Sequence, residues 1–190
     1  MLRKGADSPQ SDIRAVTDPY TQSAFSKGHV LRRLVWNVAY TLFFRPTPRP
    51  FHTWRAFVLR CFGAKLGRNA RVYNTAVIWA PWNLIMEDDT SIAEGVICYS
   101  MAQITLKEKA IVSQRCSLCT GTHDYTSKTF QLYALPITIG ERSWVCAEAF
   151  IGPGVRIGGN SVVSAGAVIM KTVPNNSLAS GNPATVRPKT

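Results

Sequence analysis

The chain has 190 residues, enough for one domain and a short appendage. Its composition is 46% hydrophobic and 17% charged, which is typical of a globular protein and excludes an intrinsically disordered chain. The net charge is +11, and most of the excess lies in residues 1–65, which hold 11 Lys/Arg and 3 Asp/Glu.

Residues 1–24 are polar and contain Pro9 and Pro19, so we expect a loose N-terminal arm. No apolar signal sequence precedes Asp18, and we therefore place the protein in the cytoplasm. The five cysteines are expected to be small apolar fillers in a reducing compartment: Cys61, Cys98, Cys116, Cys119 and Cys146. The run Cys116 to Cys119 has no second cysteine pair to complete a zinc site, so we expect no metal.

Residues 25–65 are predicted to form a short helical segment. One apolar stripe has helical spacing and is formed by Leu31, Leu34, Val35, Val38 and Leu42. The prolines of residues 45–50 end this helix, and a second helix is predicted over Thr53 to Cys61. Its core-facing side is expected to be formed by Trp54, Phe57, Val58 and Cys61.

The apolar stripe of the first helix has two interpretations. It could cap the open end of the core, or it could contact an anionic membrane from the inner face while nearby arginines meet the headgroups. We favour the cap, because an exposed stripe beside an uncovered core would leave two apolar surfaces in water.

Residues 66–173 carry an internal repeat that determines the fold. Fifteen apolar positions recur with a spacing of six, interrupted by two slips of two residues and one long excursion: Leu66, Val72, Ile78, Met86, Ile92, Cys98, Leu106, Val112, Leu118, Ile139, Val145, Ile151, Ile157, Val163 and Ile169. Neither a helix nor an ordinary strand yields a sustained period of six. Three such units complete a triangular coil, so we predict an all-β solenoid, a left-handed parallel β-helix of five coils. Residues 174–190 are predicted to form a C-terminal cap and tail.

A long excursion, residues 124–136, interrupts the repeat directly after His123. This histidine is the only one in the solenoid, and a neutral imidazole can accept a proton near neutral pH. Loops that break a repeat pass over the surface, where functional residues concentrate. His123 is therefore the candidate general base.

Several motifs together resemble a known family. Residues 121–125, 136–140 and 143–145 and the closing run Gly181-Asn182-Pro183-Ala184 look like the hexapeptide-repeat acyltransferase superfamily. Residues 44–50, 54–55, 62–64 and 79–84 add a similarity to the colanic acid biosynthesis acetyltransferases, and the likeness covers about residues 25–186.

This resemblance implies an acetyl-CoA-dependent O-acetyltransferase that acts on a sugar hydroxyl in exopolysaccharide or capsule biosynthesis. It implies direct transfer with His123 as base, no metal, a homotrimer with sites between subunits, a saccharide or lipid-linked saccharide acceptor, and no nucleic acid partner. The implied cofactor-binding residues are Trp144, Ala147, Ala165, Lys171, Gly181, Asn182, Pro183, Ala184 and Arg187. The implied substrate-binding residues are Tyr99, Ser100, Asp124 and Tyr125.

Other functions make different demands on the sequence. N-acetylation of a nucleotide-linked amino sugar shares the fold and stays an alternative. A zinc-dependent, carbonic-anhydrase-like solenoid would need three histidines, and the solenoid has one. A cysteine nucleophile at Cys116 or Cys119 would make an acyl-enzyme, but Cys116 occupies an inward position of the repeat. A non-catalytic scaffold would not need His123.

Overall fold

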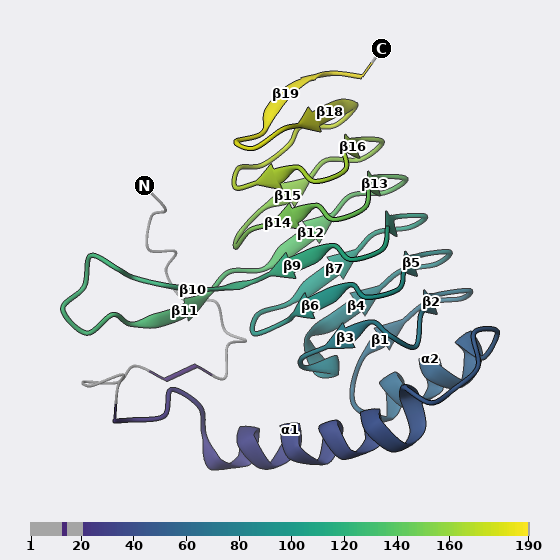
Figure 1. Ribbon diagram of the computed structural model, residues 1–190, viewed down its shortest axis with the longest axis vertical. Coiled ribbons are helices and arrows are strands. Elements are labelled where there is room, and N and C mark those ends of the chain that lie inside the picture. The colour runs from purple at the N-terminus through teal and green to yellow at the C-terminus, as the bar shows by residue number, and fades with distance from the viewer. Residues whose placement is uncertain (1–12, 15–20, 190) are drawn as a thin grey trace.

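The computed structural model describes residues 13–14 and 21–189, so most of the expected N-terminal arm lies outside the described residues. A helical layer lies across one end of a tall solenoid, and the chain climbs coil by coil to the other end (Figure 1). The helical layer contains α1 (Lys27–Ala39), a π-helical turn (Tyr40–Phe44) and α2 (His52–Cys61). Ser26 begins α1, because its hydroxyl accepts a hydrogen bond from the backbone N–H of His29 at 3.1 Å.

The solenoid is a triangular prism with three parallel walls. The first wall contains β1 (Lys65–Leu66), β4 (Leu84–Met86), β7 (Ile104–Leu106), β12 (Ile137–Ile139) and β15 (Arg156–Ile157). The second contains β2 (Arg71–Val72), β5 (Ser91–Ile92), β8 (Ile111–Val112), β13 (Trp144–Val145), β16 (Val162–Val163), β18 (Ser177–Ser180) and β19 (Thr185–Pro188). The third contains β3 (Val77–Ile78), β6 (Ile97–Tyr99), β9 (Ser117–Cys119), β14 (Phe150–Ile151) and β17 (Val168–Ile169).

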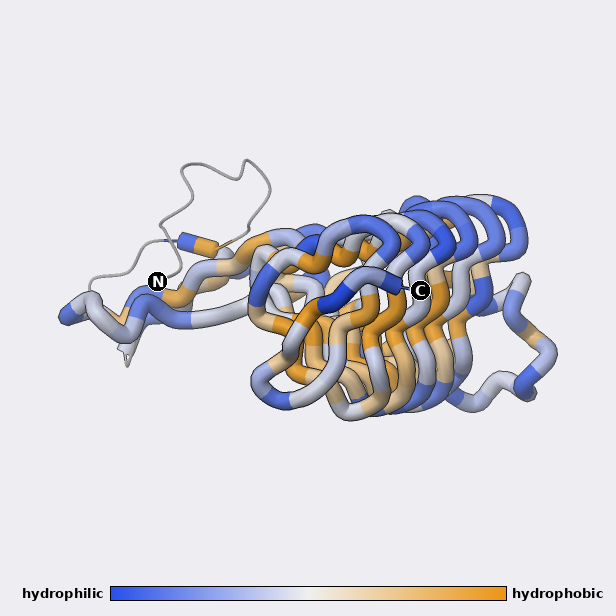
Figure 2. Tube along the Cα trace, turned by 90° about the horizontal axis from the view of Figure 1, so that it is seen from above, coloured by the Kyte–Doolittle hydropathy of each residue, from blue (hydrophilic) through white to orange (hydrophobic). Residues whose placement is uncertain are grey.

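The predicted left-handed β-helix is confirmed, and its core consists of the six-residue ladder. In the first wall, Leu66 pairs with Met86, Met86 with Leu106, and Leu106 with Ile139. Of the fifteen predicted inward positions, all are buried except Leu66, which is half-buried in the first coil. Viewed along the solenoid, hydrophobic residues line the flat walls and hydrophilic residues gather at the stacked turns (Figure 2).

The corners between the first and second walls need a left-handed backbone. Asn69, Asp89 and Asn160 have φ values of 53°, 58° and 55°, which their short polar side chains tolerate. Lys109 occupies the same corner position with φ 59°, although it lacks the short polar side chain that lets Asn and Asp adopt this conformation. Hydrogen bonds between stacked corners, such as Asn69 Nδ2 to Asp89 Oδ1 at 3.0 Å, tie successive coils together.

The helical layer caps the first coils, as expected, but it does so with the face opposite to the predicted apolar stripe. Trp36 and Phe44 are buried, and the Trp36 Nε1 donates to the Ile78 carbonyl at 2.7 Å. Arg32 and Arg33 stack on Trp82 and Trp79, each with its guanidinium 4.0 Å from a ring centroid. The large aromatic and guanidinium groups therefore cover the core, and the stripe Leu31, Leu34, Val35, Val38 and Leu42 is exposed.

The second helix required a similar correction. It buries Arg55, Ala56, Val58 and Leu59, and of the four residues expected to face the core only Val58 does so. Trp54 and Phe57 are exposed, and so is Cys61, which therefore is not an apolar filler. Periodicity alone cannot select the buried side of a helix that is apolar on two faces.

Arg55 joins α2, the proline-rich segment and the first coil. Its side chain is fully buried, and it donates to the carbonyls of Val72, Pro48 and Arg49 at 2.7, 2.8 and 2.7 Å. The same guanidinium donates to the Thr47 hydroxyl at 2.9 Å. A planar group with five donors is suited to hold several carbonyl groups that point in different directions.

The solenoid continues past the fifth coil. β18 pairs in parallel with β16, and β19 turns back to pair with β18 in the antiparallel sense. This hairpin covers the last complete coil at the end of the prism that lies opposite the helices (Figure 1).

We predict that Arg55→Lys lowers the free energy of unfolding by about 2–4 kcal/mol, because an ammonium cannot satisfy the buried carbonyls that the guanidinium holds. Thermal or urea unfolding followed by circular dichroism measures this change. Arg71→Lys, at an exposed position of β2, is the matched control and should unfold like the wild type. Equal stability of the two variants would contradict the proposed role of Arg55.

Candidate active site

His123 lies on a hairpin that leaves the third wall. The hairpin consists of β10 (Gly121–His123) and β11 (Leu132–Ala134), and His123 pairs with Leu132. The excursion expected at residues 124–136 is therefore not a simple loop, since its second half returns as a strand. The hairpin projects sideways from the prism (Figure 1).

The imidazole of His123 is held in one orientation. Its Nδ1 lies 2.9 Å from the carbonyl oxygen of Phe130, and the two rings stack with centroids 4.4 Å apart at 13°. A carbonyl only accepts hydrogen bonds, so in the neutral ring Nδ1 must carry the proton. This assignment leaves Nε2 with the lone pair, which is the form that a general base needs.

A small apolar cluster fixes the base of the hairpin. Met101, Ala102 and Ala134 form its buried centre. The partly buried residues around them are Ile13, Phe25, Trp79, Tyr99 and Leu132. A Cβ added to Gly121 would lie 2.5 Å from the Met101 sulfur, so a larger residue at the start of β10 would have to displace the Met101 side chain.

The N-terminal part of the chain also contacts this hairpin. Ile13 forms a bridge with Phe25, and the Gln131 side chain donates to the Arg14 carbonyl at 3.2 Å. Part of the segment that we expected to be a loose arm is therefore packed against the hairpin that carries the candidate base.

The four predicted substrate-binding residues have different environments. Tyr99 packs edge-on against Trp79 at 5.6 Å, and burial raises the pKa of its hydroxyl, which therefore stays protonated. Asp124 closes the hairpin turn, because its Oδ1 accepts from the Thr126 hydroxyl at 2.6 Å and backbone N–H at 3.1 Å. Tyr125 is 82% exposed at the turn.

The position of Ser100 argues against its predicted role in substrate binding. Its side chain is fully buried, and its hydroxyl both donates to the Ala80 carbonyl and accepts from the Ala80 N–H, at 3.0 Å in each case. A hydroxyl that is satisfied inside the wall cannot reach an acceptor from solvent. Ser100 therefore braces the wall against the adjacent coil.

The predicted cofactor-binding residues lie on the upper coils. Trp144 is 48% exposed on the second wall, and its Nε1 donates to the Ser113 hydroxyl at 2.8 Å. Ala147 and Ala165 occupy stacked corners one coil apart, and the Ala147 carbonyl accepts from the Gly166 N–H at 2.9 Å. Lys171 is exposed on the last coil.

The remaining predicted cofactor residues belong to the turn and strand of the C-terminal hairpin. Gly181, Asn182 and Pro183 are exposed, and the Asn182–Pro183 peptide bond is cis. Ala184 packs against the core, and Arg187 is exposed on β19 opposite Leu178.

Within one chain the candidate base and the candidate cofactor residues are separated. His123 extends from the third wall, whereas Trp144 lies on the second wall and Lys171 on a higher coil. Sequence reasoning also missed two contributors, Phe130 and Ser113. Phe130 acts through a backbone carbonyl and Ser113 through a contact to the next coil, so neither had a recognisable motif.

The cysteines do not offer an activated nucleophile. Burial raises the pKa of Cys98 to about 12 and that of Cys116 to about 11. Burial also raises the pKa values of Cys119 and Cys146. Thiols in this state remain protonated at neutral pH, and the thiolate is the reactive form. Among the described residues, no three histidine, cysteine or acidic side chains gather into a group that could hold a metal ion.

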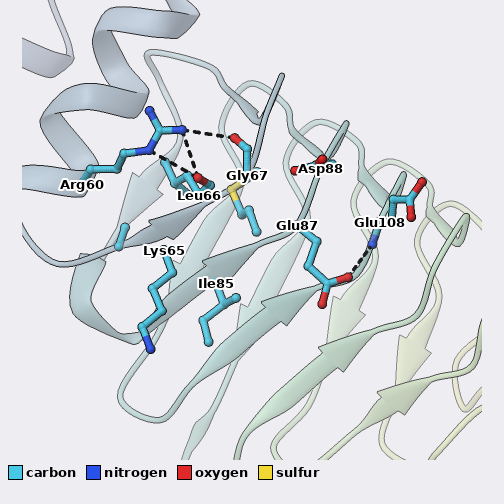
Figure 3. A pocket seen from close by; sticks show the side chains of 10 residues that line it. Arg60, Lys65, Leu66, Gly67, Ile85, Glu87, Asp88 and Glu108 are labelled. Atoms are coloured by element: carbon cyan, nitrogen blue, oxygen red, sulfur yellow. Dashed lines mark hydrogen bonds between the residues drawn. The ribbon is translucent and has the colours of Figure 1, made fainter.

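A groove beside the first wall is an alternative candidate site. It has a volume of about 750 Å³ and lies between Arg60, Lys65, Glu87 and Glu108 (Figure 3). Two of its polar groups already serve the fold: Arg60 donates to the Leu66 and Gly67 carbonyls, and Glu87 accepts from the Glu108 N–H at 3.0 Å. These bonds give Arg60 and Glu87 structural roles.

The sequence and the fold of the chain resemble those of known acetyltransferases. No family model matches the chain. The chain is 37% identical over 162 residues to WcaF of Escherichia coli strain K12, whose name describes a candidate colanic acid biosynthesis acetyltransferase. That alignment covers 85% of this chain and 89% of WcaF.

Two solved structures show the same fold. A maltose O-acetyltransferase from Clostridium difficile 630 has a TM-score of 0.79 at 24% identity, over 86% of this chain and 89% of that chain. A hexapeptide-repeat acetyltransferase from Vibrio cholerae, solved with acetyl coenzyme A, has a TM-score of 0.76 at 22% identity. That superposition covers 87% of this chain and 91% of the Vibrio chain.

We predict that brief treatment of the native protein with iodoacetamide at neutral pH alkylates the exposed Cys61 first. Cys98, Cys116 and Cys119 should be modified slowly, because burial raises their pKa values and keeps the thiols protonated below them. Peptide mass spectrometry assigns each site, and urea-unfolded protein is the control in which all five should react. Alkylation of Cys116 or Cys119 faster than Cys61 would indicate an activated nucleophile.

Proposed function

The chain belongs to the hexapeptide-repeat acetyltransferase family, and from this premise we propose that it transfers the acetyl group of acetyl-CoA to a hydroxyl of a saccharide. The observation that carries the proposal is the orientation of His123, whose Nδ1 is bound to the Phe130 carbonyl at 2.9 Å. This bond leaves Nε2 to accept the proton of an incoming hydroxyl.

In the proposed mechanism, His123 Nε2 removes the proton of the acceptor hydroxyl as its oxygen attacks the thioester carbonyl. The resulting oxyanion is stabilised by a backbone N–H. When the tetrahedral intermediate collapses, the carbon–sulfur bond breaks, and the imidazolium of His123 returns its proton to the departing thiolate. The products are an acetyl ester and the free thiol, and no acyl-enzyme forms.

We assign the acetyl-CoA donor to the corner between the second and third walls that follows Trp144 in the chain. Lower coils place Asn74, Glu94 and Gln114 at this corner, whereas the upper coils place Ala147 and Ala165 there. Small side chains leave the backbone accessible to a narrow amide-containing chain such as pantetheine. The indole of Trp144, fixed by Ser113, provides a flat wall beside it.

The nucleotide end of the donor is assigned to the C-terminal hairpin and the last coil. Lys171 and Arg187 are exposed there, and a guanidinium can bind a phosphate through two parallel hydrogen bonds. The turn Gly181 to Ala184 lies between them in the sequence and forms the surface on which this end rests.

The separation of His123 from the donor corner supports a site shared between chains. We propose a homotrimer in which the hairpin of one chain faces the second wall of its neighbour. The hairpin projects away from its own prism, which is the direction that such a contact requires (Figure 1). Contacts between different surfaces of identical chains close into a ring when the rotation permits it.

The acceptor is assigned to the saccharide class, in keeping with the names of WcaF and the maltose O-acetyltransferase. Tyr99 can donate a hydrogen bond to the acceptor from its protonated hydroxyl. Asp124 and Tyr125 follow His123 directly at the hairpin turn and would lie beside the acceptor. Amino sugars linked to nucleotides are the alternative acceptor class and form one arm of the assay below.

We predict that His123→Ala lowers kcat for acetyl transfer by about 10²- to 10⁴-fold, the usual cost of removing a general base. Release of coenzyme A is followed with a thiol reagent, against a panel of saccharides and nucleotide-linked amino sugars. Lys128→Ala, an exposed position on the same hairpin, is the matched control and should keep wild-type kcat. A His123→Ala enzyme within about twofold of wild type would refute the assignment.

We further predict that light scattering gives three times the 21.0 kDa chain mass. Mixed trimers of inactive His123→Ala chains and inactive Ala165→Glu chains, refolded together, should regain activity, because some sites then combine an intact hairpin with an intact donor corner. A 21.0 kDa monomer, or mixed trimers as inactive as each variant alone, would contradict a site shared between chains.

A further inference from the structure

The outer face of the helical layer is apolar and uncovered. Leu34, Val38 and Leu42 on this face are 59%, 52% and 59% exposed. They lie on the side of the α1 segment opposite to Trp36, which packs on the first coil. The layer lies at the end of the prism, so this face points away from the solenoid (Figure 1).

A groove deepens this face between α1 and α2. Its volume is about 630 Å³, and the side chains that line it include Leu34, Val35, Val38, Trp54 and Phe57. All the residues that line it are apolar, and three of its aromatic members, Phe43, Trp54 and Phe57, are exposed. Monomeric soluble proteins rarely expose contiguous apolar surfaces of this kind unless another surface covers them.

The segment that carries the groove has formal charges of one sign only. Residues 19–86 contain 10 Lys/Arg and no Asp/Glu. Lys27 lies at the start of α1 and Arg45 follows its π-helical end, and both are exposed. The apolar face is therefore bordered by cations, whereas all of the chain's acidic residues lie outside this segment.

We propose that this face binds the surface of an anionic lipid bilayer. The apolar side chains would enter the boundary between headgroups and acyl chains, with Trp54 and Phe57 at the level that aromatic rings prefer. The surrounding cations would meet the anionic headgroups. The helices would lie in the plane of the surface, and none in the described part of the chain has the length and hydropathy to span a bilayer.

Charge favours a bilayer over a second copy of this face. Two identical faces that pack together would bring their cationic borders against each other without a carboxylate between them, and like charges in contact are unfavourable. An anionic bilayer offers both an apolar layer and the opposite charge. The contact requires neither catalysis nor the proposed trimer.

Vesicle flotation tests the proposal with the full chain. We expect the protein to float with vesicles of phosphatidylglycerol and phosphatidylcholine in equal amounts, and to stay in solution with phosphatidylcholine alone. Raising salt from about 0.1 M to about 1 M should release most of it, because the Debye length falls from about 10 Å to about 3 Å.

Leu34→Asp should lower the bound fraction at least about tenfold and leave the melting temperature unchanged, because this side chain is already 59% exposed. Val186→Asp, a 45% exposed valine on β19 at the opposite end of the prism, is the matched control and should bind vesicles like the wild type. Lys27→Glu combined with Arg45→Glu should also reduce binding without unfolding the protein.

Three results would overturn the proposal. One is equal binding to neutral and anionic vesicles. Another is no flotation at all by a folded wild-type protein. The third is concentration-dependent self-association in sedimentation that Leu34→Asp abolishes while vesicles bind nothing, which would assign the face to a second copy.

Discussion

The fold depends on a stack of inward side chains that recurs every six residues. Each parallel strand of the walls supplies at least one apolar group to the interior, and that group rests on its equivalent in the next coil, as Val72 does on Ile92 and Ile92 on Val112. The walls are straight because the stack is regular, and the corners can turn because residues such as Asn69 and Asn160 accept a left-handed backbone. A solenoid of this kind has open ends, and both the helical layer and the C-terminal hairpin exist to cover them.

The candidate chemistry appears where this regularity is interrupted. The hairpin after β9 has no place in the prism, so a second apolar cluster around Met101 and Ala134 must hold it. That cluster, together with the Phe130 carbonyl, holds the half-buried His123 in one orientation. Rigidity of the prism supplies the fixed frame, and the hairpin carries the proposed base away from its own walls toward the proposed neighbour.

Much of the fold could be predicted from the sequence, because a period of six is a local signal that each coil repeats. The face of α1 that packs on the core could not be predicted. Trp36 and Phe44 lie on one apolar face of this segment and Leu34 and Val38 on another, and only packing decides which face is buried. Ser100 was misassigned because the sequence does not show that its hydroxyl is satisfied by Ala80. His123 could be singled out as the only solenoid histidine, yet the carbonyl that orients it has no sequence signature, and its role as base stays a prediction.

The central claim is that an oriented imidazole on one chain serves a donor held by its neighbour. A crystal structure of the protein with coenzyme A bound tests this claim most directly. We expect the thiol sulfur beside His123 Nε2 of one chain, the pantetheine arm along the Ala147 and Ala165 corner of another, and the His123 Nδ1 bond to Phe130 retained. A thiol bound next to a cysteine, or lying wholly within one chain and remote from every His123, would contradict the account.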